Sequence, residues 1–131
     1  MASIFTRIIS GELPSYKIAE DDCFFAFLDI NPLKEGHTLV VPKIEQDYLF
    51  DINDQTLQDL IVFSKRVAKA VEKSIPCDRI GVTVIGLEVP HAHIHLIPIS
   101  EINDMSFNKP KLVIDGERMS SIQKLIISHF E

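Results

Sequence analysis

The sequence contains no tryptophan and only two cysteines, Cys23 and Cys77, which form no Cys-x-x-Cys pair. Disulfide frameworks and metal sites show repeated cysteine spacing, so we interpret both side chains as free thiols in a reducing compartment. The longest apolar run, Cys23–Leu28, is far shorter than the roughly 20 residues that a membrane helix needs. The first residues, 1–7, lack a basic region followed by a long apolar block. We therefore predict a cytoplasmic protein with no membrane partner.

Positive charge is also scarce, because 13 lysines and arginines stand against 19 aspartates and glutamates, a formal net charge of −6. Nucleic acids and anionic membranes are bound non-specifically through Lys and Arg patches, so this balance argues against both partners. Apolar residues make up 46% of the 131 positions, which is enough for a core without disulfides or a structural metal. We expect a single domain over residues 1–131 in which any bound phosphate is held by local contacts.

Hydrophobic periodicity and turn residues predict several strands, one long helix between them and a helix at the end. The long helix begins at Asn53 or Asp54, either of which is a good N-cap, and ends before Pro76. The aromatic-rich segment 23–28 is typical of a strand that is buried on both faces. The other expected elements are a short helix over 4–9, strands over 16–19, 37–41, 80–85 and 92–97, and an amphipathic helix over 119–130. This order indicates an α+β fold around an antiparallel sheet of about five strands.

Three of the five histidines, His91, His93 and His95, occupy alternate positions within the segment 90–98. A strand has a period of two, so we expect their imidazoles on one open face, with the apolar residues between them facing the core. Neighbouring imidazoles repel one another when protonated, which lowers their pKa values and keeps at least one neutral and nucleophilic near pH 7. An imidazole that does carry a proton would attract an anion.

This histidine pattern allows three interpretations. A histidine face without chemistry is the weakest of them, because chance rarely gives three histidines at this spacing in a chain that has five. A zinc site is the second, since two histidines on a strand face plus another from elsewhere form a common zinc arrangement. Against zinc, Glu88 stands at an odd offset from His91, and no clear carboxylate completes the ligand set. The third is a nucleophilic imidazole that attacks phosphorus and divides one difficult displacement into two, with no metal required.

The three alternating histidines with their apolar spacers are preceded by Gly86–Pro90 and followed by Ile97-Pro98. This segment resembles the active-site strand of the histidine triad (HIT) family. A second block, Phe24–Pro32 followed by Gly36–Lys43, resembles the nucleotide-binding half of that family. The likeness covers roughly residues 3–98 in the right order, and it is to the Hint-like nucleotide hydrolases of the family. The resemblance implies a HIT-like fold and a homodimer whose subunits extend each other's sheet.

For catalysis, the resemblance implies that His93 corresponds to the nucleophile of the family. That residue attacks the α-phosphorus of a purine nucleoside phosphoramidate, a dinucleoside polyphosphate or a related nucleotidyl ester. The product is a nucleotidyl-histidine that water then cleaves, releasing adenosine or guanosine monophosphate. In such enzymes the nucleophile is surrounded by three further histidines, which here correspond to His37, His91 and His95.

For nucleotide binding, the resemblance implies that Asp29 corresponds to the carboxylate that accepts hydrogen bonds from both ribose hydroxyls. Phe27 and Ile30 correspond to residues that help to hold the base. From the residues alone, Asp29 would equally be a cap at the end of a strand, and Phe27 and Ile30 would be ordinary core. His37, which follows Gly36 at the start of a strand, would by itself be a surface histidine.

The chain also departs from the family pattern. Ser3 and Thr6 stand where many relatives have two cysteines of a structural zinc site, and since hydroxyls are poor zinc ligands we expect no metal and no cofactor. Leu87 stands in the place of a glutamine in the turn before the triad. Glu88, which we count among the nucleotide-binding residues, replaces a small hydroxyl residue that assists the leaving group in several relatives. Hydrolysis is therefore expected to be slower, or its leaving group to differ.

Three functions compete at this point, and one of them is a zinc hydrolase whose metal is held on the histidine strand. The first is a nucleotide hydrolase or transferase that acts on a purine nucleoside monophosphate attached to a leaving group. The alternative is a nucleotide-binding or sensing protein with little turnover, which Leu87 favours because polar contacts to the phosphate are lost with the glutamine.

Overall fold

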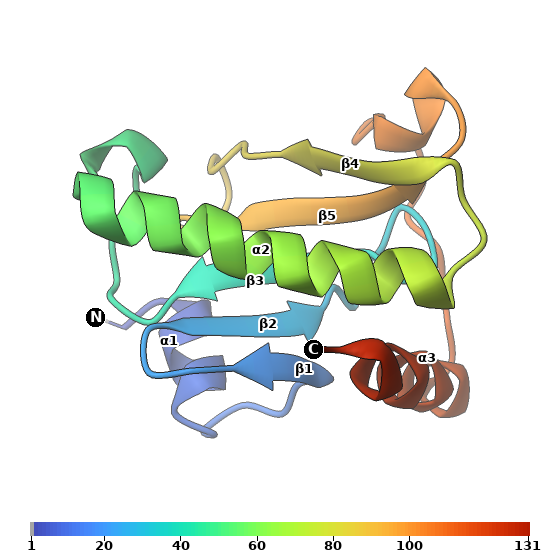
Figure 1. Cartoon of the computed structure of the whole chain (residues 1–131), viewed down its shortest axis with the longest axis horizontal. Coiled ribbons are helices and arrows are strands. Elements are labelled where there is room, and N and C mark those ends of the chain that lie inside the picture. The colour runs from blue at the N-terminus through green and yellow to red at the C-terminus, as the bar shows by residue number, and fades with distance from the viewer. Residues whose placement is uncertain (1) are drawn as a thin grey trace.

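The computed structural model describes residues 2–131, which form a five-stranded antiparallel sheet with three α-helices packed on it (Figure 1). The sheet order is β1-β2-β3-β5-β4, so β1 and β4 are its edges. The predicted α+β class and the antiparallel sheet are confirmed. The elements are α1 (Ile4–Ile9), β1 (Lys17–Glu20), β2 (Phe24–Leu28), β3 (Thr38–Pro42), the short 3-10 helix η1 (Leu49–Asp51), α2 (Asp54–Ser74), β4 (Arg79–Thr83), β5 (Ile94–Ile99), the 3-10 helix η2 (Ile102–Met105) and α3 (Gly116–His129).

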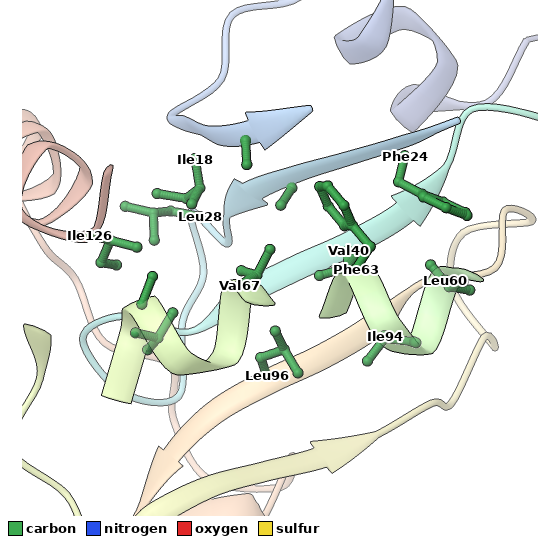
Figure 2. Close-up of a cluster of buried hydrophobic side chains, with 14 of the residues drawn as sticks. Ile18, Phe24, Leu28, Val40, Leu60, Phe63, Val67, Ile94, Leu96 and Ile126 are labelled. Atoms are coloured by element: carbon green, nitrogen blue, oxygen red, sulfur yellow. The ribbon is translucent and has the colours of Figure 1, made fainter. Parts of the chain in front are cut away.

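The main core lies between the sheet and the two long helices, α2 and α3 (Figure 2). Alternate strand residues point into this core because side chains alternate across a pleated sheet. Leu28 of β2, Val40 of β3, Ile94 of β5 and Leu60 of α2 belong to this core, and all four are fully buried.

The opposite face of the sheet carries a second, smaller cluster, to which α1 contributes Phe5. Phe25 and Phe27 of β2 lie in this cluster, while their neighbours in sequence face α2. The predicted burial of this strand on both faces is therefore confirmed. In the antiparallel register Leu39 of β3, also in the second cluster, is paired with His95 of β5. His95 consequently lies on the α1 side of the sheet, away from α2.

Local capping explains where the helices begin. The side chain of Asn53 accepts a hydrogen bond from Thr56 N at the start of α2, as predicted, and Ser3 does the same for Thr6 N at the start of α1. Pro76 lies just beyond the end of α2, whose C-cap is Ile75. No helix within residues 2–131 combines the length and the apolar character needed to cross a membrane.

The strand bounds differ from the prediction around the histidines. The expected strand over 92–97 begins only at Ile94, because the preceding backbone has partners outside the sheet. His91 N donates to Val89 O in a tight turn, and Ala92 N donates to Gln46 O. His91 and His93 therefore precede β5 instead of lying within it.

Candidate active site

A cavity of about 410 Å³ lies on the α1 side of the sheet. It is bounded by α1, by β2 and the turn that follows it, by the loop between β4 and β5, and by the loop between η2 and α3. His93 and His95 are on its wall, whereas His37 and His91 are not among the residues that line it. The predicted site residues that line the cavity are Phe27, Asp29, Ile30, Glu88, His93 and His95.

The predicted open face of three imidazoles is wrong. His91, His93 and His95 are only 0%, 7% and 7% exposed. Phe5 of α1 covers the first two, with its ring centroid 5.7 Å from that of His91 and 4.9 Å from that of His93. The sequence pattern could not reveal this cover, because Phe5 lies far from the histidines along the chain.

His91 is held from two sides and has no ring nitrogen free for chemistry. Its Nε2 lies 2.7 Å from Pro42 O, and a carbonyl oxygen only accepts, so Nε2 carries the proton. Its Nδ1 lies 2.7 Å from the hydroxyl of Ser3, which donates to it. His91 therefore acts through its backbone, because its carbonyl oxygen lies 2.7 Å from Nδ1 of His93.

His93 has one ring nitrogen that is free. Its Nδ1 must carry the proton, since the partner of that atom is the carbonyl oxygen of His91. Its Nε2 is therefore unprotonated in the neutral ring, and no group within residues 2–131 hydrogen-bonds to it. A lone pair on a fixed imidazole at a cavity wall is a nucleophile that is already oriented for attack.

A chain of hydrogen bonds gives His95 the opposite tautomer. Leu33 N donates to His37 Nδ1 at 3.0 Å, so the proton of the neutral His37 ring is on Nε2. His37 Nε2 lies 2.9 Å from His95 Nδ1 and donates to it. The remaining nitrogen of His95, Nε2, then carries a proton. The N–H of His95 is therefore a hydrogen-bond donor beside His93, and the ring centroids of these two residues are 4.9 Å apart.

Burial, more than mutual repulsion, keeps these imidazoles neutral. It lowers the pKa of His37 to about 3 and that of His95 to about 3. Repulsion from neighbouring cationic groups contributes less to both shifts. Burial also lowers the pKa of His91, although the bond to Pro42 O and the charge of Glu45 oppose it. For His91 and His95 the sequence reasoning predicted the lowered pKa and named the smaller cause.

The predicted nucleotide-binding residues line the same cavity, and Asp29 among them lies close to the histidines. Asp29 follows β2, and its Oδ1 is fixed by Asn31 N at 2.8 Å, while its Oδ2 lies 3.6 Å from His37 Nε2. Phe27 is buried and Ile30 is 69% exposed, so they form a floor and a rim. Glu88 lies at the mouth of the cavity, and the neighbouring Leu87 is 89% exposed.

Asp29, His37 and His95 form a group whose possible ligand atoms lie within 4.8 Å of one another, which raises the question of a metal. A metal needs the lone pair of each histidine nitrogen that it binds. In this arrangement His37 Nε2 carries a proton, because Nδ1 of the same ring accepts from Leu33 N. The three residues therefore do not fit a metal ion as they stand. This group also supplies the carboxylate that the sequence analysis did not find near the histidines.

Comparison with known proteins identifies the family. Residues 10–102 match the model of the HIT domain. The chain belongs to the HIT family. It is 35% identical to the adenosine 5'-monophosphoramidase HNT1 of Saccharomyces cerevisiae, over 99% of this chain and 84% of the yeast protein. This membership supports a nucleotide hydrolase.

Solved structures give the same HIT fold. A Hit-like protein involved in cell-cycle regulation from Bartonella henselae superposes with a TM-score of 0.85 at 33% identity, covering 98% of this chain and 96% of that one. A zinc-bound histidine triad family protein from Mycobacterium smegmatis superposes with a TM-score of 0.83 at 29% identity, covering 98% of this chain and 93% of that one.

Ser3 and Thr6, which the resemblance placed at the positions of zinc-binding cysteines, form a hydrogen-bonded cluster with Glu45 and His91. Glu45 Oε1 accepts from Ser3 N at 2.6 Å and from the Thr6 hydroxyl at 2.7 Å, while the Ser3 hydroxyl bonds to His91. The two bonds that Glu45 accepts lower its pKa to about 2, so its carboxylate is charged at neutral pH. Four side chains thus satisfy one another without zinc, and two of them offer only hydroxyls, which do not fit that metal.

Sequence reasoning did not find Phe5, Glu45 and Lys111, and it placed Phe107 only within a segment, 100–107, expected to shape the leaving-group side of the site. Phe107 lies against the histidines from the far side, with its ring centroid 4.9 Å from that of His95. Lys111 lines the cavity beside it. Both come from a loop with no periodic pattern that a sequence signal could reveal. Glu45 had a weak signal, because Ser3 and Thr6 are one helical turn apart and needed a polar partner.

Proposed function

We propose that this HIT protein cleaves purine nucleotides at the α-phosphorus, with Nε2 of His93 as the nucleophile. The substrates are nucleoside phosphoramidates, dinucleoside polyphosphates or related nucleotidyl esters, and the chain 1–131 acts as one catalytic domain. The observation that carries the proposal is the tautomer pattern, in which His93 presents a free lone pair beside the N–H of His95. The similarity to the yeast adenosine 5'-monophosphoramidase supports the phosphoramidate class.

The first step forms a bond from His93 Nε2 to the α-phosphorus and breaks the bond from phosphorus to the leaving group. The electron pair of that bond departs with the leaving group, which takes a proton from solvent. The ring gains positive charge, and the carbonyl oxygen of His91 at Nδ1 stabilises it. The N–H of His95 is placed to donate to a phosphate oxygen as negative charge develops there.

In the second step water attacks the same phosphorus and the nitrogen–phosphorus bond breaks. The proton that water releases balances the proton taken up in the first step, and His93 returns to its neutral tautomer. The nucleoside monophosphate leaves the cavity. Binding of the ribose falls to Asp29, whose carboxylate has lone pairs left after its bond to Asn31 N.

A nucleotide-binding or sensing protein with little turnover remains the second candidate. Leu87 favours it, since this apolar side chain is 89% exposed at the cavity and supplies no polar contact to a phosphate.

Turnover separates the two candidates. We would incubate the protein in excess over each member of a panel of adenosine and guanosine phosphoramidates, dinucleoside polyphosphates and nucleotidyl sulfates. The proposal expects release of nucleoside monophosphate in a single turnover for at least one class. Tight binding of the panel without any release of product would favour the sensing protein instead.

A further inference from the structure

The wall of the cavity holds very little positive charge for a site that binds phosphate. Among the described residues that line it, Lys111 is the one lysine or arginine, while Asp29 and Glu88 are acidic. A nucleoside monophosphate carries about two negative charges near neutral pH, since its second pKa is about 6. Its binding therefore requires a source of positive potential close to the phosphate.

Two of the histidines at the site, His37 and His95, do not supply that charge. His37 Nδ1 accepts a hydrogen bond from Leu33 N, so this ring is not an imidazolium. His95 Nδ1 accepts from His37 Nε2, which excludes a second proton on that ring as well. The sequence analysis expected a protonated imidazole among His91, His93 and His95 to attract the anion, and the hydrogen-bond pattern removes this role from His95.

Lys111 is held close to the same histidines. Its Nζ donates to Phe107 O at 2.9 Å and lies 5.5 Å from the centroid of the Phe107 ring, which packs on His95. The adjacent backbone is anchored, because Leu112 N donates to Pro32 O at 2.9 Å in the turn after β2. The positive charge of Lys111 also lowers the pKa of both His37 and His95, as expected of a cation that faces them.

We propose that Lys111 is a binding residue of the active site, and that its ammonium group supplies the positive charge against which the phosphate of the nucleotide is bound. The Lys111 side chain is exposed, and it needs to break only its hydrogen bond to Phe107 O to reach an anion in the cavity. This inference rests on the proposed function, and it adds a residue from the loop between η2 and α3 to the site. It also explains how a protein with a net charge of −6 retains an anionic ligand.

The test compares AMP with adenosine, which has the same base and sugar but no phosphate. We would measure the dissociation constants of both ligands by calorimetry for the wild type, for Lys111→Gln and for Lys111→Arg. Lys111→Gln should weaken AMP binding by roughly five- to tenfold, because one charge-assisted contact is lost, and should leave adenosine binding unchanged. Lys111→Arg should keep AMP binding within about twofold of the wild type.

Lys109→Gln is the matched control, since Lys109 is in the same loop but does not line the cavity, and it should leave both constants unchanged. The inference is overturned if Lys111→Gln binds AMP as tightly as the wild type, if it loses adenosine to the same extent, or if Lys109→Gln causes the same loss. These results would leave the proposed hydrolase standing. A wild type that binds neither AMP nor adenosine would instead contradict the proposed function itself.

Discussion

The hydroxyl of Ser3 lies 2.7 Å from Nδ1 of His91, although the two residues are 88 positions apart in the sequence. Pro42 O fixes the tautomer of His91, because a carbonyl oxygen only accepts, and the Ser3 hydroxyl then donates to the unprotonated Nδ1. The carbonyl oxygen of His91 then holds the Nδ1 proton of His93. The N-cap residue of α1 is thereby connected to the proposed nucleophile through hydrogen bonds.

The first prediction is that turnover survives removal of metal ions. Exhaustive treatment with EDTA should leave the rate unchanged, because Ser3, Thr6, Glu45 and His91 satisfy one another and the proposed chemistry needs no metal. The variant Ser3→Cys/Thr6→Cys is the matched control, since two thiolates beside His91 and Glu45 would form a four-ligand zinc set. Metal analysis should find zinc in this variant and none in the wild type. Loss of wild-type turnover in EDTA that zinc restores would contradict the account.

The second prediction concerns the ribose. Asp29→Ala should weaken AMP binding by about tenfold or more, because charge-assisted bonds to the two ribose hydroxyls are each worth about 1.5–3 kcal/mol. The wild type should discriminate against the dideoxyribose analogue of AMP, and the variant should not. Titration calorimetry with both nucleotides measures the effect. Equal affinity of the wild type for the two sugars would remove Asp29 from the ribose site.

The third prediction is a pH dependence of stability that arises from His37 and His95. Both pKa values fall from 6.5 to about 3 on folding, so below pH 6.5 the unfolded chain binds protons that the folded chain does not. The contribution of these two histidines to the free energy of unfolding should therefore be complete above about pH 6.5. It should be lost progressively as the pH is lowered toward 3. Glu45, whose pKa is lowered from 4.5 to about 2, adds its own loss only below about pH 4.5.

Denaturant unfolding between pH 7.5 and 5 isolates the histidine contribution, and NMR titration of the imidazole C–H signals assigns it. The signals of His37 and His95 should not move in this range. Titration midpoints of His37 and His95 near 6.5 would show that burial does not keep the rings neutral.

Features of the fold that depend on residues close together in the sequence could be predicted, whereas features that depend on distant contacts could not. The start of α2 at Asn53 was predictable because capping involves residues within one turn. The start of β5 was not, because Ala92 N pairs with Gln46 O across a large separation in the chain. The triad was visible as a pattern, but its burial depends on Phe5 packing over it from α1.

The protonation of the imidazoles and the position of Lys111 also depend on distant contacts. A period of two in the sequence indicates which histidines are neighbours, but it does not show which ring nitrogen accepts a hydrogen bond. That information came from Leu33 N and Pro42 O, which are backbone groups of other segments. Lys111 had no sequence signal, because its position depends on Leu112 N bonding to Pro32 O.

The fourth prediction is the oligomeric state, for which we propose a homodimer. β4 is an edge strand, and no strand within residues 2–131 pairs with its outer side. Val82 and Ile85 at this edge are 58% and 45% exposed, which favours pairing with a second chain. The other edge strand, β1, is shielded by the charged pair of Lys17 and Glu20. Light scattering at micromolar concentration should give twice the mass of the chain.

A charged residue at the β4 edge tests which surface forms this dimer. Val82→Lys should yield a folded monomer, because a buried unpaired charge opposes pairing of the edges. Circular dichroism confirms that the variant is folded. A monomeric wild type would contradict the proposal, and a dimeric Val82→Lys would show that the chains associate through another surface.

The most direct test of the account is to locate the covalent intermediate. Wild-type protein is mixed with an adenosine phosphoramidate, quenched without acid and digested, and the modified peptide is sequenced by mass spectrometry. The adenylyl group should be on His93, since its Nε2 alone has a free lone pair at the cavity wall. His93→Ala should form no adduct and lose essentially all turnover while it still binds AMP. An adduct on His91 or His95, or turnover retained by His93→Ala, would contradict the central claim.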